Sequence, residues 1–148
     1  MKTGRTKMRI ANPMMSVPGA MQALLGLSEA AEKTGLDKNF LELVYLRVSL
    51  INSCGVCIDY HSKLLRKANE TDERVYSVAG WRDVPYYTDA EKAAFALAEE
   101  MTHVHVSDDV WNEAAKHWNE AQLAGLTVAI SAINVWNRLN VATQQKVA

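Results

Sequence analysis

The stretch DKNFLELVYLRVSLINSCGVCIDYHSKLLRKA, residues 37–68, decides the fold. Its first half repeats apolar residues at steps of three and four, the spacing of one helical face, at Phe40, Leu41, Val44, Val48 and Ile51. Asp37 is a suitable N-cap for this helix. A second helix is expected over residues 54–68, after a tight turn at residues 52–53. The stretch therefore predicts two antiparallel helices joined by a short turn.

The same spacing of apolar side chains recurs along the rest of the chain. Thr71, Thr88 and Ser107 are suitable N-caps for three of these stretches. We therefore expect five further helices, over residues 18–35, 71–80, 89–103, 108–117 and 119–141. The last is apolar over so much of its circumference that we expect it in an oligomer interface. Since the only alternating segment, Thr102–Val106, is too short for a sheet, the sequence predicts an all-α fold of about seven helices.

Length and composition describe one globular domain. The chain has 148 residues, of which 49% are hydrophobic and 22% are charged, and its net charge is −1. We expect residues 1–148 to form a single domain with a basic, extended N-terminal arm at residues 1–17. The composition excludes the collagen-like, disordered and membrane-spanning classes. Because the near-neutral charge produces no overall attractive field, neither nucleic acid nor a membrane is expected as a partner.

Cysteine usage and the lack of targeting signals indicate the compartment. No apolar run of signal-peptide length follows the basic residues at 2–9, and Leu126–Val135 is too short and too polar to cross a bilayer. We therefore expect a cytoplasmic protein. The two cysteines, Cys54 and Cys57, are too few for a disulfide scaffold. In a reducing compartment, so close a pair favours a catalytic, redox or metal role.

Three reactive side chains share one face of the helix expected over residues 54–68. Cys54, Cys57 and His61 fall within an arc of about 60°. Both sulfurs lie near the helix start, where unpaired N–H groups and the helix dipole favour a thiolate. His61 could take up a thiol proton or stabilise the thiolate. Glu42, in the preceding helix, is the acid expected to face the pair and to reach His61 or a bridging water.

This set of residues suits chemistry on a peroxide or a disulfide. A thiolate attacks the outer oxygen of a peroxide and becomes a sulfenic acid, which the second thiol condenses to a disulfide. Positions i and i+3 in the first turn of a helix place two sulfurs within disulfide reach. We therefore expect a redox site built on Cys54 and Cys57.

Other interpretations of the same residues stay open. A structural zinc site would need a fourth ligand from Glu42, His103 or His105, and the second metal-binding knuckle usual in such sites is missing. Haem attachment requires a histidine directly after the second cysteine, where Ile58 stands. Thioredoxin-like chemistry expects a βαβ context, which the pattern lacks. The simplest alternative is a pair of small buried residues followed by a surface histidine.

The site residues also resemble those of a known family. Glu42, CGVC at 54–57 and His61 are similar to the E-x11-C-x-x-C-x-x-x-H signature of the AhpD-like alkylhydroperoxidases, in the carboxymuconolactone decarboxylase superfamily. Likeness to the single-domain branch extends over residues 41–83, 88–102 and 130–142. The resemblance implies an all-helical fold assembled into trimers or hexamers. It also implies thiol peroxidase activity that needs no cofactor and no metal.

The resemblance further implies a role for each residue of the site. Cys57 is implied to become the sulfenic acid, and Cys54 to be the resolving thiol and proton donor. Glu42 and His61 are implied to form the proton relay. The helix dipole alone favours Cys54 as the more acidic thiol, so which cysteine is attacked first stays open. The best-studied members carry a second histidine before the second cysteine, where this chain has Val56, so a relay that depends on it cannot operate unchanged.

A small-molecule peroxide is the substrate that the resemblance implies, with a dithiol or protein reductant of unknown identity as the electron donor. An alternative is a redox-responsive binding or regulatory oligomer with little turnover, which Val56 and the basic arm leave open. Decarboxylation of a carboxymuconolactone belongs to members without the cysteine pair, so it is less expected here. A further likeness at residues 134–138 implies a segment near the active site or the subunit interface.

Overall fold

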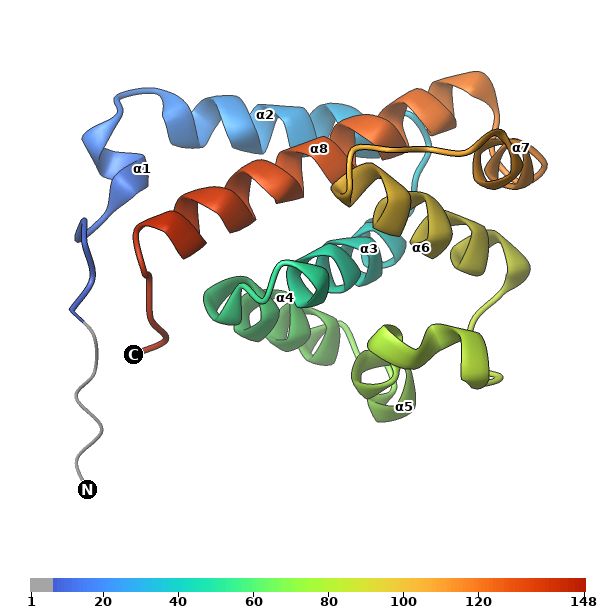
Figure 1. The fold of residues 1–148 in the computed structure, drawn as a ribbon, viewed down its shortest axis with the longest axis horizontal. Coiled ribbons are helices and arrows are strands. Elements are labelled where there is room, and N and C mark those ends of the chain that lie inside the picture. Colours follow the sequence, from blue (N-terminus) through green and yellow to red (C-terminus); the bar gives the residue numbers. More distant parts are fainter. Residues whose placement is uncertain (1–6) are drawn as a thin grey trace.

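The computed structural model describes residues 7–148, and within them every regular element is a helix (Figure 1). In this part of the chain the longer helices are α2 (Ala20–Glu32), α3 (Lys38–Ile51), α4 (Gly55–Lys67), α6 (Asp89–Thr102), α7 (Asp108–Ala115) and α8 (Glu120–Ala142). The shorter helical segments are α1 (Pro13–Ser16), α5 (Asp72–Tyr76) and the 3₁₀ helix η1 (Val78–Asp83). The predicted all-α fold class is confirmed.

Helix α3 forms the centre of the fold, packed against α4, α6 and α8 (Figure 1). The sequence pattern predicts one apolar face on this helix, and Phe40, Val44 and Val48 on that face are buried. Leu43 and Leu46, outside that face, are buried as well. Burial of one such side chain contributes about 1.5–3 kcal/mol to stability. Because neighbours hold α3 on several sides, the side chains that it carries have fixed positions.

Helix α8, the longest, lies beside α2 and contacts α3 with its buried face (Figure 1). Leu126, Ala129 and Ile130 of this face are fully buried. Val135 and Val141, elsewhere on α8, stay exposed. These exposed valines are compatible with the expected oligomer interface, which stays a prediction.

The N-terminal caps predicted from the sequence are confirmed. The side chains of Asp37, Thr71 and Ser107 each accept a hydrogen bond from the backbone nitrogen three residues later. Thr88 and Glu91 form a reciprocal capping box at the start of α6. Each cap supplies an acceptor to an N–H group of the first turn, which has no partner within the helix.

The helix predicted over residues 71–80 is wrong in its extent. The chain leaves α-helical geometry at Ser77, which separates α5 from η1, and it kinks again at Gly80. Glycine is a poor helix former, so it favours a break at this point. With α1 included, the described residues contain nine helical segments where about seven are expected.

The sequence predicts an extended N-terminal arm over residues 1–17, but Pro13–Ser16 forms the short helix α1. Pro13 occupies the first helical position of α1, where its missing N–H group costs nothing. The side chain of Asn12 caps the same turn by accepting a hydrogen bond from the backbone nitrogen of Met15. Residues 1–6 of the arm lie outside the described residues.

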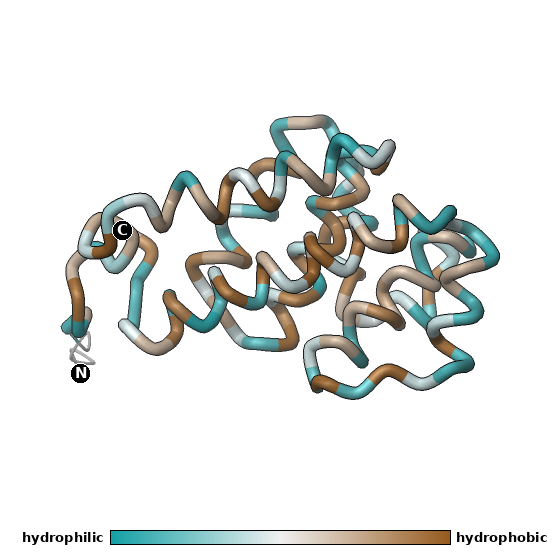
Figure 2. The backbone as a smooth tube through the Cα atoms, turned by 90° about the horizontal axis from the view of Figure 1, so that it is seen from above, coloured by the Kyte–Doolittle hydropathy of each residue, from teal (hydrophilic) through white to brown (hydrophobic). Residues whose placement is uncertain are grey.

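Hydrophilic and hydrophobic residues are interleaved along the helices (Figure 2). Even α8 carries asparagines at 134, 137 and 140 among its apolar residues. Across residues 7–148, every helix falls short of the combined length and apolarity that a membrane span needs.

Candidate active site

The C-x-x-C pair lies at the junction of α3 and α4. A tight turn at residues 52–53 joins the two helices, and Ser53 adopts a left-handed conformation with a φ of 52°. Cys54 is the N-cap residue of α4, and Cys57 lies in its first turn. The two cysteines form a disulfide, with Cα atoms 5.3 Å apart, and they are 2% and 5% exposed. The predicted position of the pair at the start of a helix is confirmed.

Helices α3 and α4 also bring Glu42 and His61 together. Nδ1 of His61 lies 2.6 Å from Oε2 of Glu42, and each residue is only 8% exposed. Since a carboxylate can only accept a hydrogen bond, Nδ1 carries the proton in this pair, which leaves Nε2 for proton exchange. Glu42 thus orients the imidazole ring and favours the tautomer that carries its proton on Nδ1.

Two tyrosines contact the imidazole of His61. The ring of Tyr45 lies 5.3 Å from it between centroids, and the ring of Tyr60 lies 5.1 Å away in an edge-on arrangement. The hydroxyl of Tyr45 is buried without a hydrogen-bond partner among the described residues. Burial raises the pKa of Tyr45 to about 12. The nearby side chain of Ser28 lowers this pKa by less than burial raises it, and it does not form a hydrogen bond with the Tyr45 hydroxyl. Tyr45 therefore offers a protonated, unused donor beside His61.

A cavity of about 1010 Å³ opens between α2, α3, α4 and α8. Cys57, Glu42 and His61 all border it, and so does Tyr45. Much of the remaining wall is apolar, with side chains from α2, α4 and α8, including Met21, Leu25, Leu64, Ile133 and Trp136. A site of this kind can admit an apolar molecule and hold its reactive group against a few polar side chains.

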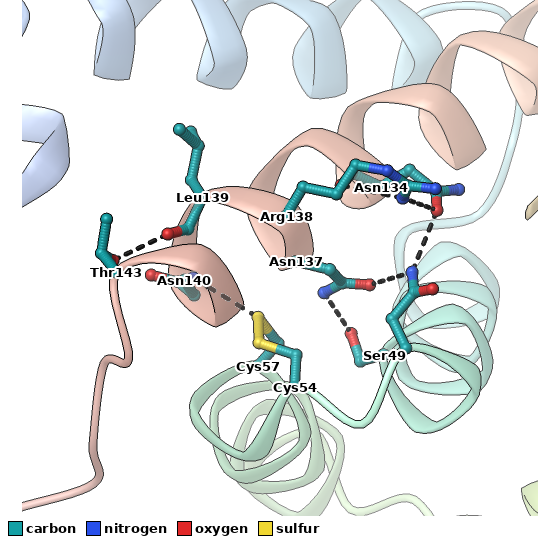
Figure 3. The surroundings of a disulfide bond; sticks show 10 residues. Ser49, Cys54, Cys57, Asn134, Asn137, Arg138, Leu139, Asn140 and Thr143 are labelled. Atoms are coloured by element: carbon teal, nitrogen blue, oxygen red, sulfur yellow. Dashed lines mark hydrogen bonds between the residues drawn. A yellow bond between two sulfur atoms is a disulfide. The ribbon is translucent and has the colours of Figure 1, made fainter. Parts of the chain in front are cut away.

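Helix α8 adds one polar contact to the sulfur of Cys57. Nδ2 of Asn140 donates a hydrogen bond to Sγ of Cys57 over 3.4 Å (Figure 3). Asn140 was not among the residues predicted for the site. The sequence pattern that could have pointed to it is the series Asn134, Asn137 and Asn140, in which three amides follow one another at three-residue steps along one side of a mostly apolar helix.

The other two asparagines of this series fasten α8 to the end of α3. Asn137 is fully buried, and its Nδ2 donates a hydrogen bond to Oγ of Ser49 over 3.1 Å. Nδ2 of Asn52 lies 3.0 Å from Oδ1 of both Asn134 and Asn137. Buried amides must keep such partners, because an unpaired polar group is costly away from water. The network therefore determines where Asn140, one turn further along α8, meets Cys57.

Comparison with known proteins places this geometry in a family. The model of the carboxymuconolactone decarboxylase family matches residues 18–100, more than half of the chain. The chain belongs to that family. The matched part contains the cysteine pair together with Glu42 and His61.

Three relatives show how far the likeness to other proteins of this kind extends. YdfG of Bacillus subtilis (strain 168), an uncharacterized protein, is 31% identical over 134 residues, which cover 88% of this chain and 91% of YdfG. The alkyl hydroperoxide reductase AhpD of Brucella anthropi is 46% identical over 50 residues, 34% of this chain and 29% of that protein. The crystal structure of ATU0492 from Agrobacterium tumefaciens, a protein of unknown function assigned provisionally to antioxidant defence as AhpD, superposes with a TM-score of 0.89. It is 31% identical, and the match covers 96% of this chain and 99% of that one.

The family's signature residues do not all face the same space in this chain. Cys57, Glu42 and His61 border the large cavity, whereas Cys54 borders a separate, smaller one. The position of the second histidine found in the best-studied family members is taken by Val56, an apolar residue that borders both cavities.

The histidines weighed as zinc ligands lie away from the site. His103 and His105, considered as zinc ligands, are exposed beyond the end of α6. Within residues 7–148, no three His, Cys, Asp or Glu side chains are grouped closely enough to hold a metal ion. In the segment at 134–138, Trp136 borders the large cavity and Arg138 bonds to Asn134 on its own helix.

Proposed function

We propose that this protein is a thiol-dependent peroxidase that reduces hydrogen peroxide or alkyl hydroperoxides. The observation that carries the proposal is the meeting of Cys57 with the bonded pair of Glu42 and His61 at the wall of one cavity. A nucleophilic sulfur, a proton carrier and a group that orients the carrier are the parts that thiol-based peroxide reduction needs.

The oxidative half-reaction starts from the reduced pair. Nε2 of His61 takes the proton of the Cys57 thiol, and the resulting thiolate attacks the outer oxygen of the peroxide. The O–O bond breaks, Cys57 becomes a sulfenic acid, and the leaving oxygen takes the proton from His61 to form water or an alcohol. Asn140 donates to the same sulfur and supports it while it carries negative charge.

The second step forms the disulfide. The sulfur of Cys54 attacks the sulfenic sulfur of Cys57, and the hydroxyl group leaves as water after it gains the proton of the Cys54 thiol. The Cα separation of 5.3 Å permits this bond without movement of the backbone. An external dithiol or protein reductant then returns two electrons to the disulfide and closes the cycle.

Relatives support the same chemistry. The Brucella anthropi protein named alkyl hydroperoxide reductase AhpD is 46% identical over its 50 matched residues.

Reducing dithiols are abundant in the cytoplasm, where we propose that the protein acts. We further propose a homo-oligomer, trimer or hexamer, that covers exposed apolar residues such as Leu25 and Val135.

The proposal is tested by following peroxide consumption in the presence of dithiothreitol. The wild-type protein should turn over, and Cys57→Ser should lose all activity because it lacks the sulfur that the peroxide is proposed to oxidise. Cys54→Ser should oxidise once, to a sulfenic acid that a dimedone probe labels at residue 57. Activity that survives in Cys57→Ser would overturn the assignment of the attacked sulfur.

The same assay separates an enzyme from a redox sensor. Fast oxidation by hydrogen peroxide or cumene hydroperoxide, followed by fast reduction, supports the peroxidase. A slow, single oxidation that changes the oligomer size, without turnover on any peroxide, would overturn the peroxidase and indicate a redox-responsive regulator.

A further inference from the structure

The structure assigns separate entrances to the two substrates of this cycle: we infer that the reducing dithiol attacks Cys54 from a second cavity, on the other side of the disulfide from the peroxide site. This inference rests on the proposed peroxidase function and adds the place and target of the reductant. The second cavity has a volume of about 390 Å³.

The disulfide divides the two cavities. Cys57 borders the large cavity with Glu42 and His61, while Cys54 borders the small one. Val56 and Asn140 border both and so form the partition between them together with the disulfide. Each cysteine therefore borders a cavity of its own.

The geometry of disulfide exchange determines which of the two sulfurs a thiolate in each cavity can attack. The incoming thiolate approaches one sulfur along the extension of the S–S bond, opposite the sulfur that leaves. A thiolate in the small cavity can meet this requirement at Cys54, with Cys57 as the leaving group. A thiolate in the large cavity would instead attack Cys57, among the groups that receive the peroxide.

The exchange transfers two electrons from the reductant dithiol to the disulfide of Cys54 and Cys57. The reductant thiolate bonds to Sγ of Cys54, the disulfide breaks, and Cys57 leaves as a thiolate that accepts a hydrogen bond from Asn140. The second thiol of the reductant then gives up its proton and attacks the mixed disulfide. Cys54 is released with that proton, and the reductant leaves as a disulfide. Cys57 is thus regenerated as a thiolate at the wall of the large cavity. The proton that the first thiol of the reductant released to solvent is taken up by Nε2 of His61, so the leaving oxygen of the next peroxide again has a proton to take.

The C-terminal segment, residues 144–147, forms one wall of the small cavity. It is held by a bond from the backbone nitrogen of Gln145 to the carbonyl oxygen of Asn140 over 2.9 Å. The side chain of Gln145 also donates to the carbonyl oxygen of Ile10 over 2.7 Å. Because this wall leaves limited room, the site fits a slender dithiol of low molecular mass.

Gly55 offers a way to fill the small cavity. It borders this cavity and not the large one, and a Cβ placed on it meets no atom within 4 Å. In Gly55→Leu the side chain should occupy the space in front of Cys54. Gly26→Leu is the matched control, because Gly26 also has open space around its Cβ and borders neither cavity.

The decisive measurement is the rate at which dithiothreitol reduces the isolated, disulfide-bonded protein, followed by acid quenching and thiol alkylation in the absence of peroxide. Gly55→Leu should be reduced about tenfold more slowly than the wild type, and Gly26→Leu at the wild-type rate. Oxidation of the reduced Gly55→Leu protein by peroxide should keep its rate. Equal reduction rates in all three proteins would overturn the inference.

Two further measurements keep the inference testable if Gly55→Leu does not fold. A chain that ends at Thr143 lacks one wall of the small cavity and should be reduced several-fold faster than the full chain. Glutathione, a monothiol, should form a mixed disulfide that fragmentation mass spectrometry locates on Cys54. An adduct on Cys57, or no gain in rate on truncation, contradicts the inference. Since these assays contain no peroxide, they remain separate from the test of peroxidase activity.

Discussion

Nδ2 of Asn140, in the last turn of α8, donates a hydrogen bond to Sγ of Cys57 over 3.4 Å, although the two residues are 83 positions apart in the sequence. A donor at this place favours negative charge on the sulfur, because hydrogen bonds to ionised groups are stronger than those to neutral ones. Helix α8 thus contacts the cysteine pair as well as the core.

Replacement of Asn140 by leucine should slow the reaction of reduced Cys57 with peroxide by about tenfold, the effect of losing one charge-assisted hydrogen bond. The measurement is the second-order rate of oxidation by stopped flow, together with the rate of alkylation by iodoacetamide at pH 7. Asn112→Leu, on the exposed surface of α7, is the matched control. Wild-type rates in Asn140→Leu would show that the contact only packs α8 against α4.

Glu42→Gln should reduce the peroxidase rate by about 10²-fold, at the lower end of the range for loss of general acid–base catalysis. Glutamine preserves the size of the side chain and an acceptor oxygen for Nδ1 of His61, but it removes the negative charge beside the ring. The check is the dependence of the oxidation rate on pH in both proteins. A profile with the same shape and height as that of the wild type would contradict a proton relay through this pair.

Local patterns predicted much of this site, and tertiary contacts decided the rest. The positions of Cys54, Cys57 and His61 on one helical face follow from helical periodicity, and the caps follow from residue type. The bond from Asn140 could not be predicted, because it depends on the packing of α8 across the start of α4. Nor does periodicity show that each cysteine borders a different cavity, since this depends on the path of the C-terminal segment.

Tyr45→Phe should leave the free energy of unfolding at pH 7 unchanged or raise it by about 1 kcal/mol, because the lost hydroxyl is buried and unpaired. Tyr87→Phe is the matched comparison, since the hydroxyl of Tyr87 donates to the carbonyl oxygen of Arg74 over 2.5 Å. Its loss should lower the free energy of unfolding by about 1 kcal/mol. Urea denaturation of the three proteins measures both effects, and an equal loss of stability in both variants would show that the Tyr45 hydroxyl has a partner.

The burial of Tyr45 also predicts a loss of stability in alkali. Its pKa is raised to about 12 in the folded protein, mainly by burial, so folding disfavours the phenolate. The stabilisation is complete below the ordinary tyrosine pKa of about 10 and is lost as the pH rises toward 12. The free energy of unfolding of Tyr45→Phe should therefore fall less steeply over this range. Parallel slopes in the two proteins would contradict the prediction.

Stability in acid should depend on the ion pair between Arg74 and Glu91. Burial alone would raise the pKa of Glu91, but hydrogen bonds from Arg74 and Thr88 outweigh it and hold this pKa below its ordinary value. The stabilisation is therefore present above the unfolded pKa of about 4.5 and is lost as the pH falls through the lower folded value. Between pH 7 and pH 3, the free energy of unfolding should fall more steeply in the wild type than in Glu91→Gln, as followed by urea denaturation. Glu113→Gln is the control, because Glu113 is exposed and its partners within residues 7–148 are the nearby Lys116 and His117 at the end of α7. A wild-type slope in Glu91→Gln would show that other carboxylates determine the acid limit.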